Sequence, residues 1–267
     1  MPQPLTVAEG TCVRLADFDP AYRGDVEGKK QARKETAENV QVLGELGHRL
    51  YAEGQRSLLL ILQGMDTSGK DGTIRRVMYG FNPQSCRVVS FKEPSAEELA
   101  HDFLWRIGRA VPRRGYVGIF NRSHYEDVLI VRVHNLVPEE EWKTRYERIN
   151  AFERLLAAGG TTIVKVFLHI SKERQRRRLQ ARVDDPEKRW KFSHRDLSER
   201  RLWDDYQAAY EAVLNRCNTA VAPWYIVPSD RKWYRNLVVS RLLRAALEEL
   251  DPQFPPAEEG IEGIVVE

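Results

Sequence analysis

The chain has 267 residues, of which 42% are hydrophobic and 30% charged, and its formal net charge is +3. This apolar fraction is enough for a sizeable core, but the long apolar runs, 58–62 and 163–168, are far below the roughly 20 residues of a membrane-spanning helix. The three cysteines are scattered, which excludes a disulfide scaffold and a cysteine-rich zinc module. The N-terminus lacks the basic and apolar regions of a secretory signal, so we expect a cytoplasmic protein with no membrane partner.

Short apolar segments alternate with helical patterns along the chain. Residues 1–27 show no clear period and indicate an irregular arm. Strands are predicted over 57–63, 86–91, 116–120, 161–170 and 223–227, and helices over about 28–54, 70–79, 95–109, 125–131, 138–158, 171–183, 196–216 and 231–250. This alternation is typical of a parallel sheet with helices on both faces. An acidic tail follows over 253–267.

The sharpest motif comes directly after the first predicted strand. Residues 64–71, GMDTSGKD, match the phosphate-binding pattern G-x-x-x-x-G-K, with Asp71 where Ser or Thr is usual. The glycines let backbone N–H groups converge on phosphate oxygens, the following helix N-terminus favours an anion, and Lys70 would reach the terminal phosphates. We therefore predict a phosphate site in this loop. An ordinary glycine-bearing turn between a strand and a helix is the alternative.

Two carboxylates belong to this loop, Asp66 and Asp71. Carboxylate oxygens are hard ligands that suit Mg²⁺, and a metal ion would also offset their charge beside a polyanion. Both are therefore candidate metal ligands. For Asp71 the alternative is a helix N-terminal carboxylate that the helix dipole stabilises.

A second polar cluster, NRSHYED over 121–127, follows the third predicted strand. In phosphate-loop proteins this strand end usually brings an acidic metal ligand, but here the first polar position is Asn121. We interpret Asp127 as replacing or supplementing that carboxylate, while Arg122 is able to bind phosphate in a bidentate way. His124 is expected to be structural. The alternative is a helix start that is merely rich in polar residues.

The third feature is a strongly basic segment, since residues 171–201 hold twelve Lys or Arg against six Asp or Glu. Arg174, Arg178 and Arg182 share one face of the predicted helix, and the break at Asp185–Pro186 leads on to Lys191. In nucleotide kinases this place holds a lid that closes over phosphates. A solvated helix face and a nucleic-acid patch are the alternatives. The isoelectric point near 8.7 is mild for a nucleic-acid binder, so we expect no nucleic-acid partner.

With these residues in view, the chain resembles the second polyphosphate kinase family over about residues 29–250. The resemblance rests on GMDTSGKDG (64–72), FKEPS (91–95), HDFLWR (101–106), RRGYVGIFNRSHYEDV (113–128), DDPEKRWKFS (184–193) and APWYIVPSDRKWYRN (222–236). The first and fourth segments look most like the subgroup that phosphorylates both AMP and ADP. The chain departs from other subgroups at Asn121, where they typically have an acid.

The resemblance implies an α/β fold of the P-loop kinase type. It would have three layers, with a five-stranded parallel sheet between helices, in a domain over 28–252 that includes a helical lid at about 184–200. The reaction would transfer phosphoryl groups between inorganic polyphosphate and adenine or guanine nucleotides, with Mg²⁺ or Mn²⁺ as cofactor. A homo-oligomer, dimer or tetramer, is the implied assembly.

The resemblance also assigns roles to individual residues. Catalysis falls to Lys70, Arg122, Asp66 and Asp127, and metal binding to Asp66, Asp71 and Asp127. Nucleotide or phosphate contacts fall to Gly64, Thr67, Ser68, Gly69, Asp71, Asn121, Glu126, Arg178, Arg182 and Lys191. The resemblance places Arg75 and Lys92 on a polyphosphate track, and the charge of the substrate suggests Arg76 as a further member.

Physical reasoning favours the same kind of site, because polyphosphate offers charge but no base or sugar, and an elongated cationic channel suits it best. Two other functions stay open at this point. An ATP-dependent nucleoside monophosphate kinase of the thymidylate kinase type would share the fold, but would have Ser or Thr at position 71. A non-catalytic nucleotide- or nucleic-acid-binding module is supported by Asn121 and opposed by the three candidate carboxylates.

Overall fold

Six strands form one sheet in the computed structural model, which describes residues 5–7 and 12–266. They are β1 (Leu5–Thr6), β2 (Ser57–Gln63), β3 (Cys86–Ser90), β4 (Val117–Asn121), β5 (Thr161–His169) and β6 (Trp224–Pro228). Their spatial order is β1-β6-β5-β2-β4-β3. The five strands from β2 to β6 run parallel, as predicted. The carboxyl ends of β2 and β4 therefore lie side by side, with Leu62 paired to Asn121.

The sequence did not predict β1, which lies within the expected irregular arm. This two-residue strand pairs antiparallel with β6 at the edge of the sheet, and two residues are too few to show a strand period. The arm also contains a short 3₁₀ turn, η1 (Leu15–Asp17). Residues 1–4 and 8–11 of the predicted arm lie outside the described residues.

The strand β2 is buried along its whole length because β4 and β5 flank it and helices cover both of its faces. Its side chains alternate between two hydrophobic clusters, with Leu59 and Ile61 in one and Leu58, Leu60 and Leu62 in the other. This two-sided burial explains the unbroken apolar run that precedes the glycine loop.

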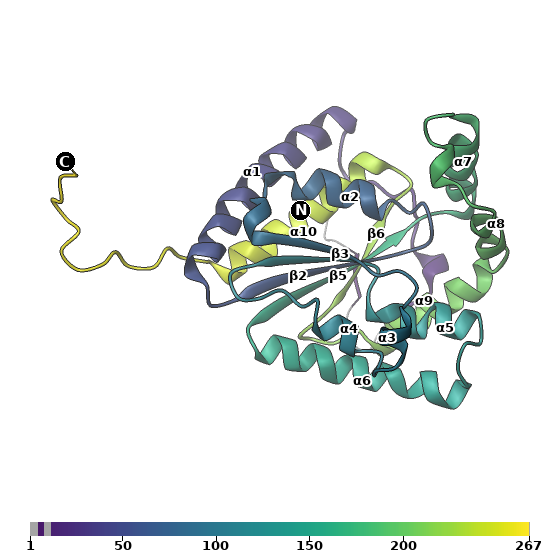
Figure 1. Ribbon diagram of the computed structural model, residues 1–267. Helices are drawn as coiled ribbons and strands as arrows, with labels where there is room; N and C mark the ends of the chain where they lie inside the picture. The colour runs from purple at the N-terminus through teal and green to yellow at the C-terminus, as the bar shows by residue number, and fades with distance from the viewer. Residues whose placement is uncertain (1–4, 8–11, 267) are drawn as a thin grey trace.

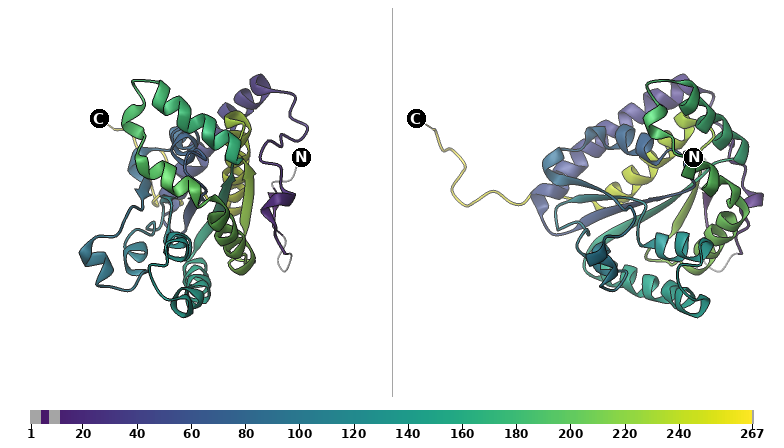
Figure 2. Two further views of the ribbon diagram at one scale, coloured as in Figure 1. Left: turned by 90° about the vertical axis from the view of Figure 1, so that its right-hand side faces the viewer. Right: turned by 45° about the vertical axis from the view of Figure 1, so that its right-hand side comes forward.

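Helices pack on both faces of the sheet (Figures 1 and 2). One face is covered by α1 (Lys29–Glu53), α2 (Lys70–Val77) and α10 (Lys232–Leu250), whose apolar residues belong to one cluster. The other face is covered by α6 (Glu139–Ala158) and α9 (Trp203–Arg216), which belong to the second cluster. The turns η2 (Met78–Gly80) and η3 (Pro83–Ser85) lead from α2 to β3. The predicted three-layer α/β fold is confirmed.

Three predicted helices are shorter or more broken than expected. The helix over 95–109 is two single turns, α3 (Ala96–Leu99) and α4 (Trp105–Gly108), because the Asp102 carboxylate accepts the Leu104 N–H and favours a turn between them. The segment 125–131 is instead a 3₁₀ turn, η4 (His124–Val128), followed by α5 (Ile130–Val133). The helix over 196–216 is divided at Leu202, whose backbone leaves the helical region.

The segment between β5 and α9 stands to one side of the sheet (Figures 1 and 2). It comprises α7 (Lys172–Asp184), η5 (Arg189–Lys191) and α8 (His194–Arg201). A capping box between Ser193 and Asp196 begins α8, none of whose residues is buried. We call residues 184–200 the lid segment. Its sparse packing contrasts with the buried faces of α9 and α10.

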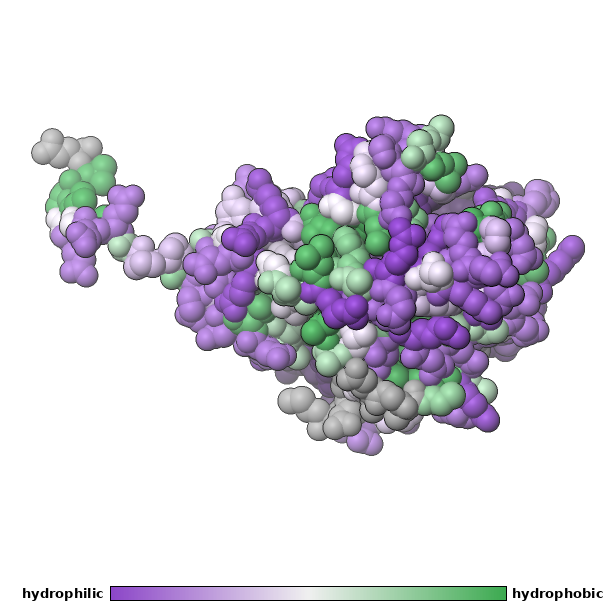
Figure 3. Space-filling view, turned by 90° about the horizontal axis from the view of Figure 1, so that it is seen from below, coloured by the Kyte–Doolittle hydropathy of each residue, from purple (hydrophilic) through white to green (hydrophobic). Residues whose placement is uncertain are grey.

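The surface away from the core is largely polar. Seen from below, it is mostly hydrophilic, with small groups of hydrophobic residues between the charged ones (Figure 3). The tail after α10 extends away from the body as an exposed segment, and hydrophobic residues lie near its end (Figures 1 and 3). Within the described ranges, no helix is both long and apolar enough to cross a membrane.

A buried polar network ties η4 to the core. The Lys165 ammonium on β5 donates to Glu153 Oε2 at 2.6 Å, to the Tyr125 hydroxyl at 2.8 Å and to the Cys217 carbonyl at 2.6 Å. The side chains of Lys165 and Glu153 are fully buried. Burial opposes ionisation of Glu153, but Lys165 and His124 hold the pKa of that carboxyl below its usual value. The network therefore fixes the segment after β4 from behind.

We expect Lys165→Met to lower the free energy of unfolding by about 3–5 kcal/mol, because it removes the ammonium that pairs with the buried Glu153 carboxylate. Urea denaturation followed by circular dichroism measures this change. The matched control is the double variant Lys165→Met/Glu153→Leu, which removes both charges and should recover most of the loss. A double variant as unstable as the single one would contradict the prediction.

Candidate active site

The glycine loop connects β2 to α2 through backbone conformations that few residues adopt. Gly64 and Gly69 have φ values of +144° and +111°, and Thr67 also has a positive φ, of +62°. A Cβ atom on Gly64 would lie 2.7 Å from the Leu168 carbonyl oxygen. Glycine is therefore required at position 64 by both backbone angle and space. The loop turns sharply enough to begin α2 with Lys70 directly after Gly69.

The Lys70 ammonium lies against the loop that precedes it. Its Nζ donates to the Gly64 carbonyl at 2.6 Å and to the Met65 carbonyl at 3.4 Å. Burial and the neighbouring Arg122 lower the pKa of Lys70 to about 8, although Asp66, Glu126 and Asp71 act in the opposite direction. A lysine so placed carries its charge at neutral pH but titrates within the range of ordinary buffers.

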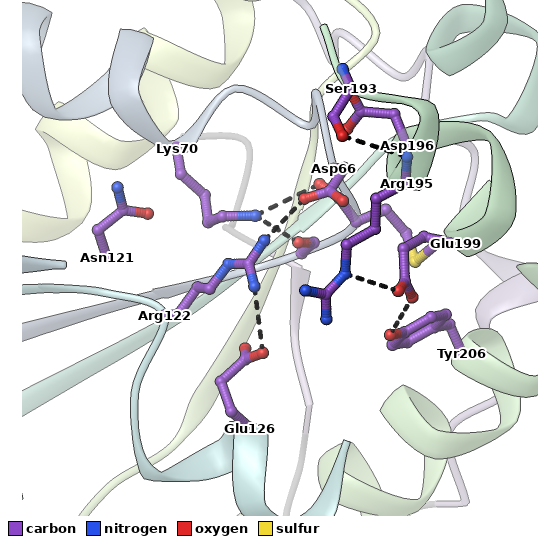
Figure 4. Close-up of polar contacts among 12 residues, drawn as sticks. Asp66, Lys70, Asn121, Arg122, Glu126, Ser193, Arg195, Asp196, Glu199 and Tyr206 are labelled. Carbon is purple, nitrogen blue, oxygen red and sulfur yellow. Dashed lines mark hydrogen bonds and ion pairs between the residues drawn. The ribbon is translucent and has the colours of Figure 1, made fainter. Parts of the chain in front are cut away.

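Arg122 follows β4 in a left-handed conformation, with φ of +63°. Its Nη2 is 2.9 Å from Asp66 Oδ1 and its Nη1 is 3.6 Å from Glu126 Oε2. Glu126 and Asp66 both raise the pKa of Arg122, and burial acts against them. The structure thus brings the loop and the second motif together, with Asp66, Lys70, Arg122 and Glu126 in one cluster (Figure 4).

Asn121 holds the carboxylate at the start of α2. Its Nδ2 donates to Asp71 Oδ1 at 2.8 Å, and Ser90 Oγ lies 3.4 Å from the same nitrogen. An amide suits this place because a carboxylate at position 121 would face the Asp71 carboxylate at hydrogen-bond distance. Asn121 in place of the usual acid therefore goes together with Asp71 in place of the usual Ser or Thr.

Asp127 pairs with arginines. Its carboxylate is 3.3 Å from Arg145 Nη1 and 3.8 Å from Arg106 Nη2. Burial raises the pKa of Asp127 to about 6, although both arginines act to lower it. One of its oxygens, Oδ2, is buried and accepts no hydrogen bond within the described part of the chain. At pH 7 this carboxyl is mostly ionised.

The three carboxylates predicted as one metal site have separate partners. Asp66 pairs with Arg122, Asp71 bonds to Asn121, and Asp127 lies between two arginines. Over residues 5–7 and 12–266, no three His, Cys, Asp or Glu side chains form a metal-binding group. The chain alone does not assemble the predicted set, since Asp66 and Asp127 are paired with different arginines and Asp71 is hydrogen-bonded to an amide.

A cavity of about 1220 Å³ opens between the strand ends, α6 and the lid segment. Asp66, Asp71, Asn121, Arg122, Glu126 and Asp127 all line it. The side facing them comes from the lid segment and α9, where Arg195 points inward beside Glu199 and Tyr206 (Figure 4). Arg195 Nε is 3.3 Å from Glu199 Oε1, and the Tyr206 hydroxyl donates to Glu199 Oε2 at 2.6 Å.

The predicted lid cations lie elsewhere. The Arg178 guanidinium donates to the carbonyls of Thr67, Ser68, Ser229 and Asp230 at 2.6–3.2 Å, and burial lowers its pKa to about 10. Arg182 donates to the Lys191 carbonyl, and Lys191 is exposed beside Trp190. None of the three predicted cations lines the cavity. Arg178 bonds to carbonyls of the glycine loop outside the cavity lining, because α7 turns that residue toward the sheet.

The predicted polyphosphate track is only partly adjacent to the cavity. Lys92 lines it. Arg75 and Arg76 are exposed in the last turn of α2 and are not among the lining residues. Arg75 and Arg76 lie apart from the cavity because the end of α2 is directed away from the loop where the helix begins.

Sequence reasoning missed several residues that shape the site, namely Arg106, Arg145, Arg195, Tyr206 and Arg235. Arg106 and Arg235 lie inside segments already recognised as similar to the family, which is a signal that could have found them. Arg195 is two residues beyond such a segment. Arg145 and Tyr206 lie in ordinary helical patterns, and nothing in the sequence distinguishes them from surface positions.

Known proteins resemble the chain over nearly its whole length. A model of the family described as Polyphosphate kinase 2 matches residues 26–255. A Meiothermus ruber protein named AMP/ADP-polyphosphate phosphotransferase is 54% identical over 254 residues, covering 95% of this chain and 95% of that protein. A Rhodopseudomonas palustris protein named ADP-polyphosphate phosphotransferase is 47% identical over 93% of this chain and 90% of that protein. The crystal structure of polyphosphate kinase 2 from Arthrobacter aurescens TC1 has a TM-score of 0.93 and 45% identity, and covers 96% of this chain and 92% of that one.

We expect binding of inorganic triphosphate to weaken as the pH rises through about 8. Burial and Arg122 lower the pKa of Lys70 to about 8, so the free protein loses an attracting ammonium above that pH. The association constant should then fall by up to about tenfold per pH unit. Isothermal titration calorimetry from about pH 6.5 to about pH 9.5 measures the change, in the range where Lys70 loses its proton.

Lys70→Arg is the matched control for this titration, because a guanidinium keeps its proton throughout that range. The pH dependence should disappear in this variant. An affinity that stays constant in the unaltered protein, or a fall that persists in Lys70→Arg, would assign the titration to another group.

Proposed function

The chain belongs to the polyphosphate kinase 2 family, and we propose on that premise that it transfers phosphoryl groups between inorganic polyphosphate and AMP or ADP, forming ADP and ATP. The name of the Meiothermus relative contains AMP, ADP and polyphosphate, and the name of the Rhodopseudomonas relative contains ADP and polyphosphate. The observation that carries the proposal is that two cations, Lys70 and Arg122, contact residues of the glycine loop. Lys70 bonds to the loop and Arg122 pairs with Asp66 within it.

The transfer proceeds as an in-line displacement. An oxygen of the acceptor phosphate attacks the terminal phosphorus of polyphosphate, so that one P–O bond forms. The bond to the next phosphate breaks, and its electron pair leaves with the shortened polyphosphate. The acceptor oxygen is already ionised near neutral pH, so the step needs no general base. Lys70 and Arg122 stabilise the charge that spreads over the migrating group.

Mg²⁺ or Mn²⁺ is the cofactor in this proposal. Mg²⁺ usually takes one or two carboxylates together with substrate phosphates and water, so separate carboxylates fit it better than a closed protein site would. The buried Asp127 Oδ2 accepts no hydrogen bond within the described chain and is a fitting ligand atom. Asp66 and Asp71 are the other candidate ligands, on the loop side of the cavity. When bound, the metal neutralises charge on the phosphate oxygens.

The lid segment completes the site by closing over the phosphates. Arg195 lines the cavity and has an exposed side chain, so it is free to follow a bound anion. Its ion-pair partners in the structure are Glu199 at 3.3 Å and Glu93 at 3.8 Å. Both are carboxylates, and a bound phosphate chain offers anionic oxygens that take their place. Closure excludes water from the reacting groups.

The thymidylate kinase type of activity, with ATP as the donor, is not favoured. The family and both named relatives carry polyphosphate in their names, and Asp71 stands where that enzyme type would have Ser or Thr. No observation favours a non-catalytic binding module. A homo-oligomer, dimer or tetramer, and a cytoplasmic location belong to the same proposal, as does the division into an arm, a kinase domain with its lid, and an acidic tail.

AMP and ADP incubated with polyphosphate and Mg²⁺ in the absence of ATP should be converted to ADP and ATP. Lys70→Ala should reduce kcat/KM by about 10²–10³-fold, as expected for loss of a group that stabilises developing charge. Chromatographic quantification of the nucleotides measures both. Lys34→Ala, which removes an exposed lysine of α1, is the control and should leave the rate unchanged. If products form only when ATP replaces polyphosphate, the proposal that polyphosphate is the phosphoryl donor is refuted.

Arg195→Ala should lower kcat/KM for polyphosphate by about tenfold or more, because the lid segment would lose a charge-assisted hydrogen bond to the phosphate chain. Steady-state kinetics with varied polyphosphate measure the loss. Arg177→Ala is the matched control, since Arg177 is exposed and bonded to Glu173 on the outer face of α7. Equal rates for the two variants would mean that Arg195 does not reach the substrate.

A further inference from the structure

Arg235 lies beneath the glycine loop and belongs to none of the roles assigned so far. It is in the first turns of α10 and is 2% exposed. Its Nη1 donates to the Ser68 carbonyl at 3.1 Å, while its Nε and Nη2 donate to Asn236 Oδ1 at 3.2 and 2.9 Å. A buried guanidinium is thus hydrogen-bonded to the backbone of the phosphate loop.

The loop is shaped around this guanidinium. A Cβ atom on Gly69 would lie 1.7 Å from Arg235 Nη1, and one on Gly72 would lie 3.3 Å from Nη2. The glycine before Lys70 is therefore needed to admit Arg235, in addition to allowing a positive φ. The two features form a matched pair, with a glycine on the loop and an arginine behind it.

Arg235 has no carboxylate to neutralise it. Among the residues that the structure describes, no ion pair joins a carboxylate to Arg235 or to Arg178, which bonds to the same Ser68 carbonyl. Asp230 is the acidic group that acts on Arg178, from beyond ion-pair distance, and burial together with Arg178 lowers the pKa of Arg235 to about 9. Two like charges therefore lie behind the loop with backbone carbonyls as their partners.

We infer that Arg235 is a positioning residue whose buried charge and hydrogen bond to Ser68 hold the loop in its anion-binding form for a phosphate chain. A trans peptide directs its C=O and N–H to opposite sides, so a Ser68 carbonyl held toward Arg235 turns the Gly69 N–H away from it. The negative charge that offsets Arg235 then comes from the bound substrate. A residue that only supported the loop structurally would not need a charge, because burying a charge costs free energy.

The inference rests on the proposed function, because it takes the loop to bind phosphate. Polyphosphate and nucleotide share this chemistry, and two probes distinguish them: inorganic triphosphate and ADP, each titrated with Mg²⁺ by calorimetry. Arg235→Met removes charge and hydrogen bond, Arg235→Gln keeps a donor but removes the charge, and Arg235→Lys keeps the charge. Arg244→Met is the control, since Arg244 lies on the same helix but pairs with Glu248 at the surface.

Arg235→Met and Arg235→Gln are expected to weaken the probe that occupies the loop by about tenfold or more, with the other probe changed by less than about twofold. Arg235→Lys should recover part of the loss, and Arg244→Met should bind both probes normally. If Arg235→Met does not fold, Arg235→Gln carries the same test. Unchanged affinity for both probes in Arg235→Gln, with or without a lower Tm, would overturn the inference. So would equal losses in Arg235→Gln and Arg235→Lys.

Lys70→Ala distinguishes failure of this inference from failure of the proposed function. If neither Lys70→Ala nor Arg235→Gln weakens either probe, the loop is not the phosphate site and both proposals fail. If only Lys70→Ala weakens a probe, the loop keeps its function and the role of Arg235 is refuted.

Discussion

Repulsion between like charges is the constraint that the site must satisfy before any substrate arrives. Lys70, Arg122, Arg178 and Arg235 all converge on one short loop, and each adds to the cost of holding the others there. Burial lowers the pKa values of Lys70, Arg178 and Arg235, and the neighbouring cation Arg122 adds to this effect at Lys70, as Arg178 does at Arg235. A bound phosphate chain offsets this repulsion and favours the charged form of each cation, because it brings negative charge to the place where the fold has concentrated positive charge. The same feature that makes the loop costly to hold therefore makes it bind an anion.

The chain offsets these cations in two different ways. In front of the loop, Arg122 pairs with Asp66 and Glu126, which are carboxylates that a phosphate is able to displace from the guanidinium and that a metal ion is able to attract. Behind the loop, Arg178 and Arg235 bond to backbone carbonyls of the loop itself, which carry no net charge that a phosphate would displace. The front groups are thus free to rearrange during transfer, whereas the rear groups fix the shape of the loop. Preorganised charge of the second kind costs no reorganisation when the reaction takes place.

Much of this architecture could be predicted from the sequence, and the errors share a cause. The five parallel strands were predicted because buried strands and amphipathic helices show their burial in local composition, and the loop motif is local too. The break at Leu202, the turn at Asp102 and the direction in which Arg178 points depend on packing between distant segments. Arg178 was predicted to face the phosphates because helical spacing groups residues on one face, but spacing alone does not say what that face meets. Arg235 was missed for the same reason, since its partner Ser68 is 167 residues away.

The lid segment differs from the rest of the fold in how it is held. No residue of α8 is buried, and its contacts with the body include the polar pair between His134 and Glu199 at 3.0 Å. Segments with few buried apolar contacts open at low free-energy cost, which is consistent with the closure proposed for this segment. The body, by contrast, buries an apolar face on α9 and α10 and the whole of β2. A rigid loop opposite a loosely held segment that carries Arg195 into the cavity suits a long polyanion, because the polyanion must enter, be gripped at one end, and leave shortened by one phosphate.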